Sequence, residues 1–102
     1  MKQTEELTVI NDLSLKQYEI VVHPNDGYDL GLLDKHNYIK VFSGNTLEEF
    51  NKEDGRYMPG QLSLANECRT GTVIINSKHW NSLGKPKKIK LFYNEKKLLI
   101  AD

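Results

Sequence analysis

The stretch 71–101 reads GTVIINSKHWNSLGKPKKIKLFYNEKKLLIA, and its order of strand formers and breakers decides the expected fold. Thr72 to Ile75 is a run rich in β-branched residues, which is typical of a strand on a half-buried, pleated surface. Ser77 predicts the start of a short helix, because its hydroxyl can accept from an unpaired amide of the first turn. Gly84 predicts the end of that helix, and Pro86 prevents it from resuming.

Further strands are expected on both sides of this unit. Residues 61–66 alternate leucines with polar neighbours, and Gly71 is expected to mark a bend before the next strand. Segments 88–93 and 97–101 are rich in apolar residues and flank the turn sequence Asn-Glu-Lys, which predicts a closing hairpin. The second half of the chain is thus expected to run strand, strand, short helix, hairpin.

The first half is also β-rich but is interrupted more often. Residues 1–12 are polar without a sustained period, so a flexible arm is expected. Residues 17–23 have the alternation of a strand, and the sequence His-Pro-Asn-Asp-Gly at 23–27 then predicts a tight turn. Two short strands, 28–33 and 38–42, are expected to follow as a hairpin. No internal repeat is apparent.

A short helix and a loop are expected to join the two halves. In residues 46–50, Thr46 and Glu49 have the spacing of a capping box, which predicts one or two helical turns. Residues 51–60 carry two glycines and a proline among charged residues, which indicates a loop.

Charge divides the chain near this loop, although the net charge is zero. Residues 1–60 carry a net charge of −5, and residues 61–102 carry +5. We expect one domain spanning residues 1–102, with an acidic β-rich half at 13–60 and a basic half at 61–102. Such asymmetry is compatible with a basic surface for nucleic acid, and equally with two faces that attract each other or a neighbouring subunit.

Composition favours a cytoplasmic binding protein. The apolar fraction of 38% predicts a thin core, and no apolar run approaches the roughly 20 residues that cross a bilayer. The N-terminus lacks the basic and apolar regions of a signal peptide. Cys68 is the only cysteine, which fits a reducing compartment. The expected fold is mainly β, a small barrel-like single domain with one or two short helices, or a partly open barrel of five or six strands.

The segment from about residue 62 to residue 100 resembles the SpoVT/AbrB-type swapped-hairpin domain of transition-state regulators and some antitoxins. The spacing from Gly71 to the Leu-Gly pair ending at Gly84 agrees without a gap, and residues 88–100 occupy the place of that family's final hairpin. The resemblance implies a homodimer in which two chains exchange hairpins, and a protein that binds duplex DNA. Asn76 stands where the family usually has proline. Three other positions that often hold arginine in DNA-binding members are Thr72, Trp80 and Asn81.

Five basic residues remain as candidates for phosphate contacts without base reading: Arg69, Lys78, Lys85, Lys87 and Lys88. The alternative is that these side chains only solvate a loop. Trp80 either fills the core or contacts a partner, because a one-turn helix covers little surface. Two functions follow: a small DNA-associated regulator or antitoxin-like protein, and a protein-interaction module, of phage or mobile-element origin, that binds no nucleic acid.

Neither catalysis nor a cofactor is expected. Cys68 and His79 are the nearest approach to a catalytic pair, but no local signature accompanies them. The histidines and Asp26 show no close ligand pair of the kind zinc sites use. Four aromatic residues on expected strands are candidates either for the core or for stacking on single-stranded bases: Tyr38, Phe42, Phe92 and Tyr93.

Overall fold

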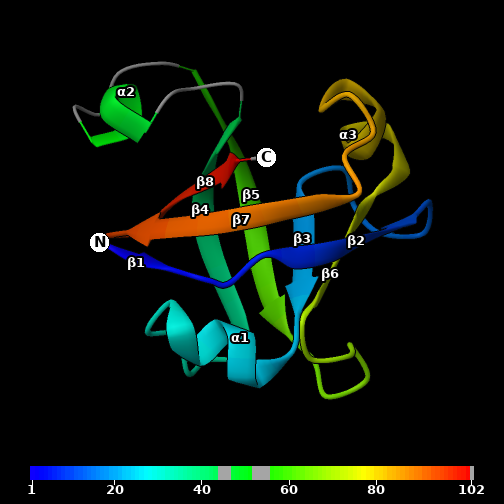
Figure 1. Ribbon diagram of the computed structural model, residues 1–102, viewed down its shortest axis with the longest axis horizontal. Coiled ribbons are helices and arrows are strands. Elements are labelled where there is room, and N and C mark those ends of the chain that lie inside the picture. Colours follow the sequence, from blue (N-terminus) through cyan, green and yellow to red (C-terminus); the bar gives the residue numbers. More distant parts are fainter. Residues whose placement is uncertain (44–46, 52–55, 102) are drawn as a thin grey trace.

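The computed structural model describes residues 1–43, 47–51 and 56–101 (Figure 1). Its strands are β1 (Lys2–Gln3), β2 (Leu7–Asp12), β3 (Glu19–Val22), β4 (His36–Ser43), β5 (Tyr57–Leu64), β6 (Thr72–Asn76), β7 (Lys88–Asn94) and β8 (Lys97–Ala101). Its helices are α1 (Pro24–Asp29), α2 (Leu47–Asn51) and α3 (Ser77–Ser82). Within these residues no helix combines the length and apolar character that a membrane span requires.

The strands form a closed barrel. The sheet runs β1-β7-β2-β6-β3-β5-β4-β8, and β8 also pairs with β7, so that seven strands close on themselves. Strands β2 and β6 are parallel, as are β3 and β5, and as are β4 and β8. Closure leaves no open edge among those seven strands, and β1 extends the same edge of β7 that pairs with β2. The mainly β, barrel-like fold expected from the sequence is therefore confirmed.

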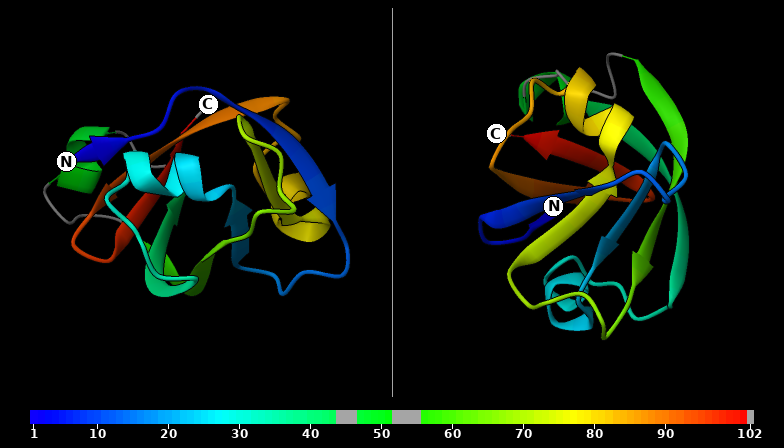
Figure 2. Two further views of the ribbon diagram at one scale, coloured as in Figure 1. Left: turned by 90° about the horizontal axis from the view of Figure 1, so that it is seen from below. Right: turned by 90° about the vertical axis from the view of Figure 1, so that its right-hand side faces the viewer.

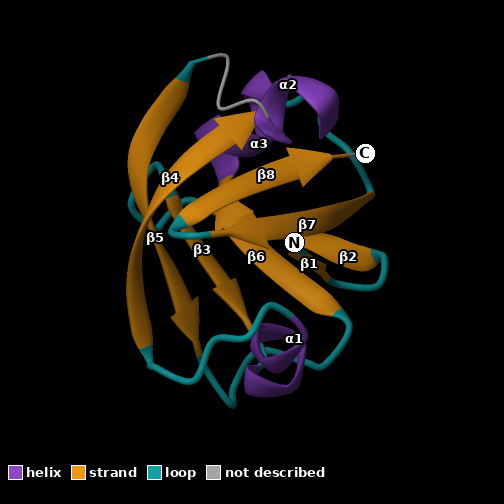
Figure 3. Ribbon diagram, turned by 90° about the vertical axis from the view of Figure 1, so that its left-hand side faces the viewer, coloured by secondary structure: helices purple, strands orange, loops and turns teal. Residues whose placement is uncertain are grey.

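The helices lie at the two ends of this barrel (Figure 3). Because β3 and β6 pair antiparallel, the helix that follows each strand emerges at an opposite end. α1 follows β3 and covers one end, whereas α3 follows β6 and lies at the other end, where α2 lies on the opposite side of the molecule from α3 (Figure 1 and Figure 2). We call these the α1 end and the α3 end.

Six of the seven barrel strands belong to two similar units, which the sequence does not reveal. Each unit has a strand, a loop, a second strand, a six-residue helix and a third strand: β2-β3-α1-β4 in the first, and β5-β6-α3-β7 in the second. Positions correspond at a constant offset of 53 residues (76 − 23), at which Leu30 matches Leu83 and Gly31 matches Gly84. Strand register agrees with this offset, since Thr8 pairs with Thr72 and Gln61 pairs with Glu19. The two units interlock through the pairing of β3 with β6.

The core is built from both units. Five of its fully buried residues come from five different strands: Leu7, Ile20, Leu62, Ile75 and Ile89. A smaller cluster lies separately, where Phe50 of α2 meets Phe42 at 5.3 Å between ring centroids, with Leu99 and Phe92 beside them. Phe42 therefore has a packing role, and Phe92 is half-buried against it. Because the two units and β8 close the barrel within one chain, the barrel here needs no hairpin from a partner.

Several local expectations are confirmed. The strand at 17–23 is β3, the strand at 38–42 is β4, and the run at 72–75 is β6. The closing hairpin forms from β7 and β8, with Glu95 and Lys96 in the left-handed region of a two-residue turn. The helix after β6 is also present, although Asn76 rather than Ser77 caps it: the Asn76 Oδ1 accepts from the amides of Lys78 and His79 at 2.8 and 3.3 Å.

Other local expectations are wrong. Residues 7–12 form β2 instead of a flexible arm, because they pair with both β6 and β7. The expected turn at 23–27 and strand at 28–33 are instead α1 and the turn after it, with His23 Nδ1 accepting from the amide of Asn25 as the N-cap. In the expected loop 51–60, β5 begins at Tyr57. Thr46, half of the expected capping box, lies outside the described residues, while α2 is present at Leu47–Asn51.

Candidate nucleic-acid interface

Three of the five candidate basic residues lie together at the α3 end. Lys78 is exposed on α3, and Lys85 and Lys87 are exposed in the connection from α3 to β7. Gly84 and Lys85 both have positive φ, 87° and 57°, and the Lys85 amide donates to the Trp80 carbonyl at 3.0 Å. This left-handed pair reverses the chain immediately after the helix. We call Lys78, Lys85 and Lys87 the α3 lysines.

The other two candidates differ from the α3 lysines, Arg69 by its position and Lys88 by an acidic neighbour. Arg69 lies in the loop before β6, at the α1 end, where Asp26 Oδ2 accepts from the neighbouring Gly71 amide at 2.8 Å. Lys88 is exposed at the start of β7, but its Nζ lies 3.6 Å from Glu6 Oε1. An ion pair of this exposure is weak, yet it offers Lys88 a competing anion. The expected set of five thus separates into four lysines of the segment 77–88, one of which pairs with Glu6, and Arg69 at the α1 end.

Trp80 has a structural role in the α3 segment. It is half-buried and packs against the main core, and its Nε1 donates to the Pro86 carbonyl at 2.9 Å. That bond ties the helix to the connection carrying Lys85 and Lys87. Of the two readings of Trp80, core packing is the one its contacts support.

The equivalent segments that follow β3 and β6 differ in charge. From Ser77 to Lys88 the chain carries four lysines and no acid, whereas the corresponding stretch of the first unit, 24–35, carries three acids and one lysine. Among the described residues, none of the α3 lysines lies within 4.0 Å of a carboxylate oxygen. Positive charge is therefore concentrated in the segment 77–88, and its exposed lysines are open to an anionic ligand.

A shallow apolar trough, which the sequence analysis missed, adjoins the α3 end. It has a volume of about 320 Å³ and is lined by Lys16, Gln17, Tyr18, Tyr38, Pro59, Gly60 and Gln61. Two barrel strands form its floor, because Tyr38 on β4 pairs directly with Gln61 on β5. The segment between β2 and β3 supplies the remaining wall. We call it the tyrosine trough.

Local contacts fix the trough's shape. Because Gly60 has no side chain, β5 lies close to Tyr18 and to β4: a Cβ at this position would lie 2.5 Å from the Tyr18 carbonyl oxygen and 2.7 Å from Val41 Cγ2. The Gln61 side chain donates to Ser63 Oγ at 2.8 Å, which holds its amide against β5. Tyr38, by contrast, is 79% exposed on the barrel's outer face. Of the four aromatic residues proposed from sequence for base stacking, Tyr38 has its ring open to a ligand.

Beneath Tyr18 lies a buried histidine. His79 of α3 is 1% exposed, and its ring meets Tyr18 edge to face with 5.2 Å between centroids. Neither ring nitrogen has a hydrogen-bond partner in the part of the chain that the structure describes. Burial lowers the pKa of His79 below its ordinary value, so its ring is neutral at neutral pH. This residue links α3 to the wall of the trough.

The residues considered for catalysis do not meet. Cys68 is 1% exposed in the loop before β6, with its Sγ 3.4 Å from the Thr72 carbonyl, whereas His79 follows the other end of that strand. Burial, and after it the charge of Asp26, raises the pKa of the Cys68 thiol. A thiol held protonated is a poor nucleophile. In the described part of the chain, no group of three or more His, Cys, Asp or Glu side chains is arranged to hold a metal.

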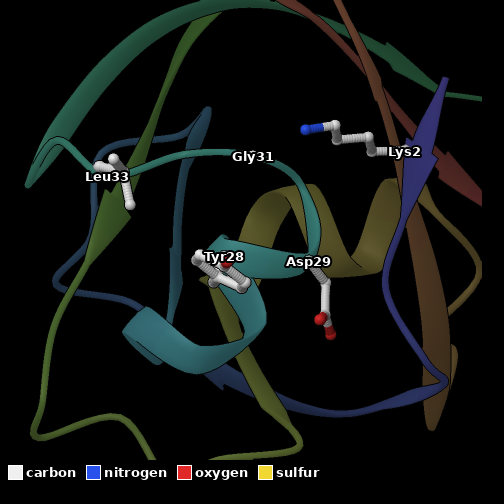
Figure 4. Close-up of a pocket in the computed structure, with 5 residues that line it drawn as sticks. All are labelled: Lys2, Tyr28, Asp29, Gly31 and Leu33. Carbon is white, nitrogen blue, oxygen red and sulfur yellow. The ribbon is translucent and has the colours of Figure 1, made fainter.

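A second hollow, of about 440 Å³, lies at the α1 end (Figure 4). It is lined by Lys2, Tyr28, Asp29, Gly31 and Leu33. The Lys2 amine reaches over Gly31, whereas the Asp29 carboxylate points in a different direction (Figure 4). The hollow offers one amine and one carboxylate and thus no excess of positive charge, so we do not assign the nucleic-acid contact to it.

Comparison of the chain with models of known protein families, with curated proteins and with solved structures found no match. The likeness to the swapped-hairpin domain therefore stays a resemblance of the segment around residues 62–100.

Proposed function

We propose that this protein is a small, non-enzymatic, DNA-associated regulator that contacts phosphates through the α3 lysines. The observation that carries the proposal is the difference in charge between equivalent segments at opposite ends of the barrel: residues 77–88 carry four lysines and no acid, whereas residues 24–35 carry three acids and one lysine. Phosphates would be attracted to the segment 77–88 and repelled by the segment 24–35, which orients the protein on its ligand.

The geometry favours phosphate contact over base reading. Lys78, Lys85 and Lys87 are flexible point charges on a one-turn helix and a loop, and such side chains position a protein on DNA without identifying its sequence. The Trp80 bond to Pro86 restrains the segment that carries two of them. Homodimer formation stays a prediction, whose physical basis is now the complementary charge of the two ends.

A salt series with a fluorescently labelled duplex tests the proposal. We expect measurable binding at low salt that falls steeply between about 50 and 200 mM, because each neutralised phosphate releases counterions. Replacing Lys78, Lys85 and Lys87 together by glutamine should reduce the slope of log affinity against log salt by about 2 to 3, because each phosphate contact contributes roughly 0.9 to that slope.

A double replacement of Lys35 and Arg69 by glutamine is the matched control. Both side chains are exposed, and Arg69 lies at the α1 end, so this variant should bind DNA like the parent. Equal affinity of the triple variant and the parent would contradict the proposal. No binding even at low salt would also contradict it and would favour the protein-interaction module.

A further inference from the structure

We propose that the tyrosine trough stacks the unpaired bases of a nucleic acid strand, which makes single-stranded nucleic acid the preferred ligand. This inference rests on the proposed function, because the α3 lysines would hold the phosphates of the same strand. Aromatic rings bind bases of every sequence through their faces, and lysines beside them follow the backbone.

The first argument is the exposure of Tyr38. With 79% of its surface open on the outer face of β4, it contributes little to the core, although most aromatic residues of a chain this poor in apolar residues are needed there. Tyr18 and Pro59 complete an apolar floor beside it. A planar apolar ligand is therefore suited to the site.

The second argument is charge. Lys16 lines the trough, and Lys40 follows Tyr38 on the same outer face of β4, opposite Pro59. Lys40 Nζ lies 4.9 Å from the centre of the Tyr57 ring, and neither ammonium group pairs with a carboxylate among the described residues, although the Lys16 backbone amide donates to Glu19 Oε1 at 3.4 Å. No acidic side chain lines the trough. An occupant with apolar rings and a negative backbone fits this arrangement, and an unpaired nucleic acid strand has both.

The third argument is continuity with the α3 lysines. The Tyr18 ring touches His79 of α3, the helix that carries Lys78. The trough and the basic segment thus share one end of the barrel, so that one strand can cross both surfaces. In a duplex the bases are stacked on each other and cannot enter the trough.

The test measures anisotropy of a labelled twelve-nucleotide oligothymidylate and of a duplex of equal length at low salt. We expect Tyr38→Ala to weaken binding of the single strand by about 5-fold to 150-fold, which corresponds to about 1 to 3 kcal/mol per stacked base, and to leave duplex binding unchanged. Tyr38→Phe should retain single-strand affinity, because the ring and not the hydroxyl is required. Tyr28→Ala is the matched control, since Tyr28 is 71% exposed on α1, outside the trough.

The outcomes separate this inference from the proposed function. If Tyr38→Ala and the parent bind the single strand equally while the triple lysine variant is weakened, the trough has no role in base binding and the proposed function stands. If Tyr38→Ala binds the single strand more weakly and the triple lysine variant binds it like the parent, the trough binds bases and the proposed phosphate contact of the α3 lysines is contradicted. Loss of self-association in sedimentation velocity for Tyr38→Ala, with single-strand affinity intact, would assign the trough to a second copy of this chain and overturn the inference.

Discussion

His79 should make the stability of the barrel depend on pH in the mildly acidic range. Its ring is 1% exposed, and both nitrogens lack partners in the described structure. Burial therefore lowers its pKa in the folded protein, while the unfolded chain keeps the ordinary value of about 6.5. Below that pH the unfolded chain binds a proton that the folded protein does not. Stability is then fully present above about pH 6.5 and is lost as the pH falls toward the folded-state pKa.

The magnitude follows from this linkage. Each pH unit between the two pKa values lowers the free energy of unfolding by up to about 1.4 kcal/mol. At pH 5.5 the loss attributable to His79 should approach about 1.4 kcal/mol relative to pH 8, as long as the folded form takes up no proton. For a small domain this is a substantial part of the whole stability.

His79→Leu is the informative variant. It removes two unpaired buried nitrogens, whose desolvation costs about 1 to 3 kcal/mol, and it also removes the edge-to-face contact with Tyr18, worth about 0.5 to 1.5 kcal/mol. At pH 7.5 the variant should equal the parent in stability or modestly exceed it. Below pH 6.5 the variant should keep stability that the parent loses.

Urea unfolding followed by circular dichroism between pH 5 and 8 measures both effects. His36→Gln is the control, because this exposed variant keeps His79 and should show the parent's loss. A His79→Leu protein with the same pH dependence as the parent would refute the reasoning. So would a His79 ring resonance that titrates in the folded protein with a midpoint near 6.5.

Two further predictions concern packing around the candidate site. Trp80→Ala should lower the free energy of unfolding by about 3 kcal/mol, because the ring packs on the core and its Nε1 donates to the Pro86 carbonyl. Chemical unfolding measures this loss. If the variant were as stable as the parent, Trp80 would instead be a partner contact. Gly60→Ala should lower the free energy of unfolding by about 1 to 3 kcal/mol, because the added Cβ would meet the backbone at Tyr18. At Gly71 an added Cβ meets nothing within 4 Å, so Gly71→Ala should lower it by only about 1 kcal/mol, through the strain of a left-handed backbone. Equal thermal unfolding of these two glycine variants would contradict the packing argument.

The elements that could be predicted are those whose signals are local. The β-branched run of β6, the short helix behind it and the turn between β7 and β8 each carry their determinants within a few residues. Where a local signal is ambiguous, prediction fails. The sequence His-Pro-Asn-Asp-Gly is typical of a turn, but proline at the first position of a helix and a polar residue before it are equally a helix start.

Gly27 shows why the ambiguity was resolved wrongly. Glycine in this context predicts a turn, yet Gly27 is buried inside α1, where a Cβ would overlap the side chain of Leu64 on β5. The residue is small because another strand approaches it, and that approach is not visible in the sequence. β2 was missed for a related reason: Leu7 is fully buried, but Ile10 is 49% exposed, so the alternation that marks a half-buried strand is blurred.

The candidate site also depends on contacts between residues that are far apart in the sequence. The tyrosine trough joins residues from the segment before β3 to residues on β4 and β5, and nothing in their spacing places Tyr18 beside Tyr38. The two-unit architecture is not apparent in the sequence, because equivalent positions share a structural role more often than a residue type. His23 and Asn76 cap equivalent helices with different side chains, and only the geometry makes them comparable.

The two units also suggest why one end of the barrel would bind nucleic acid and the other would not. Inside the barrel, equivalent positions keep their apolar character, as Ile20 and Val73 do. At the helices they diverge: Asp26 of α1 accepts a hydrogen bond from the Gly71 amide, whereas the equivalent His79 of α3 meets the equivalent Tyr18 through its ring. The acid thus closes the α1 end onto its loop by a polar bond, and the histidine supports an aromatic wall without adding negative charge. Because equivalent interior positions are apolar in both units, the difference between the two ends lies in surface and helix-cap positions such as these. The proposed function depends on those positions.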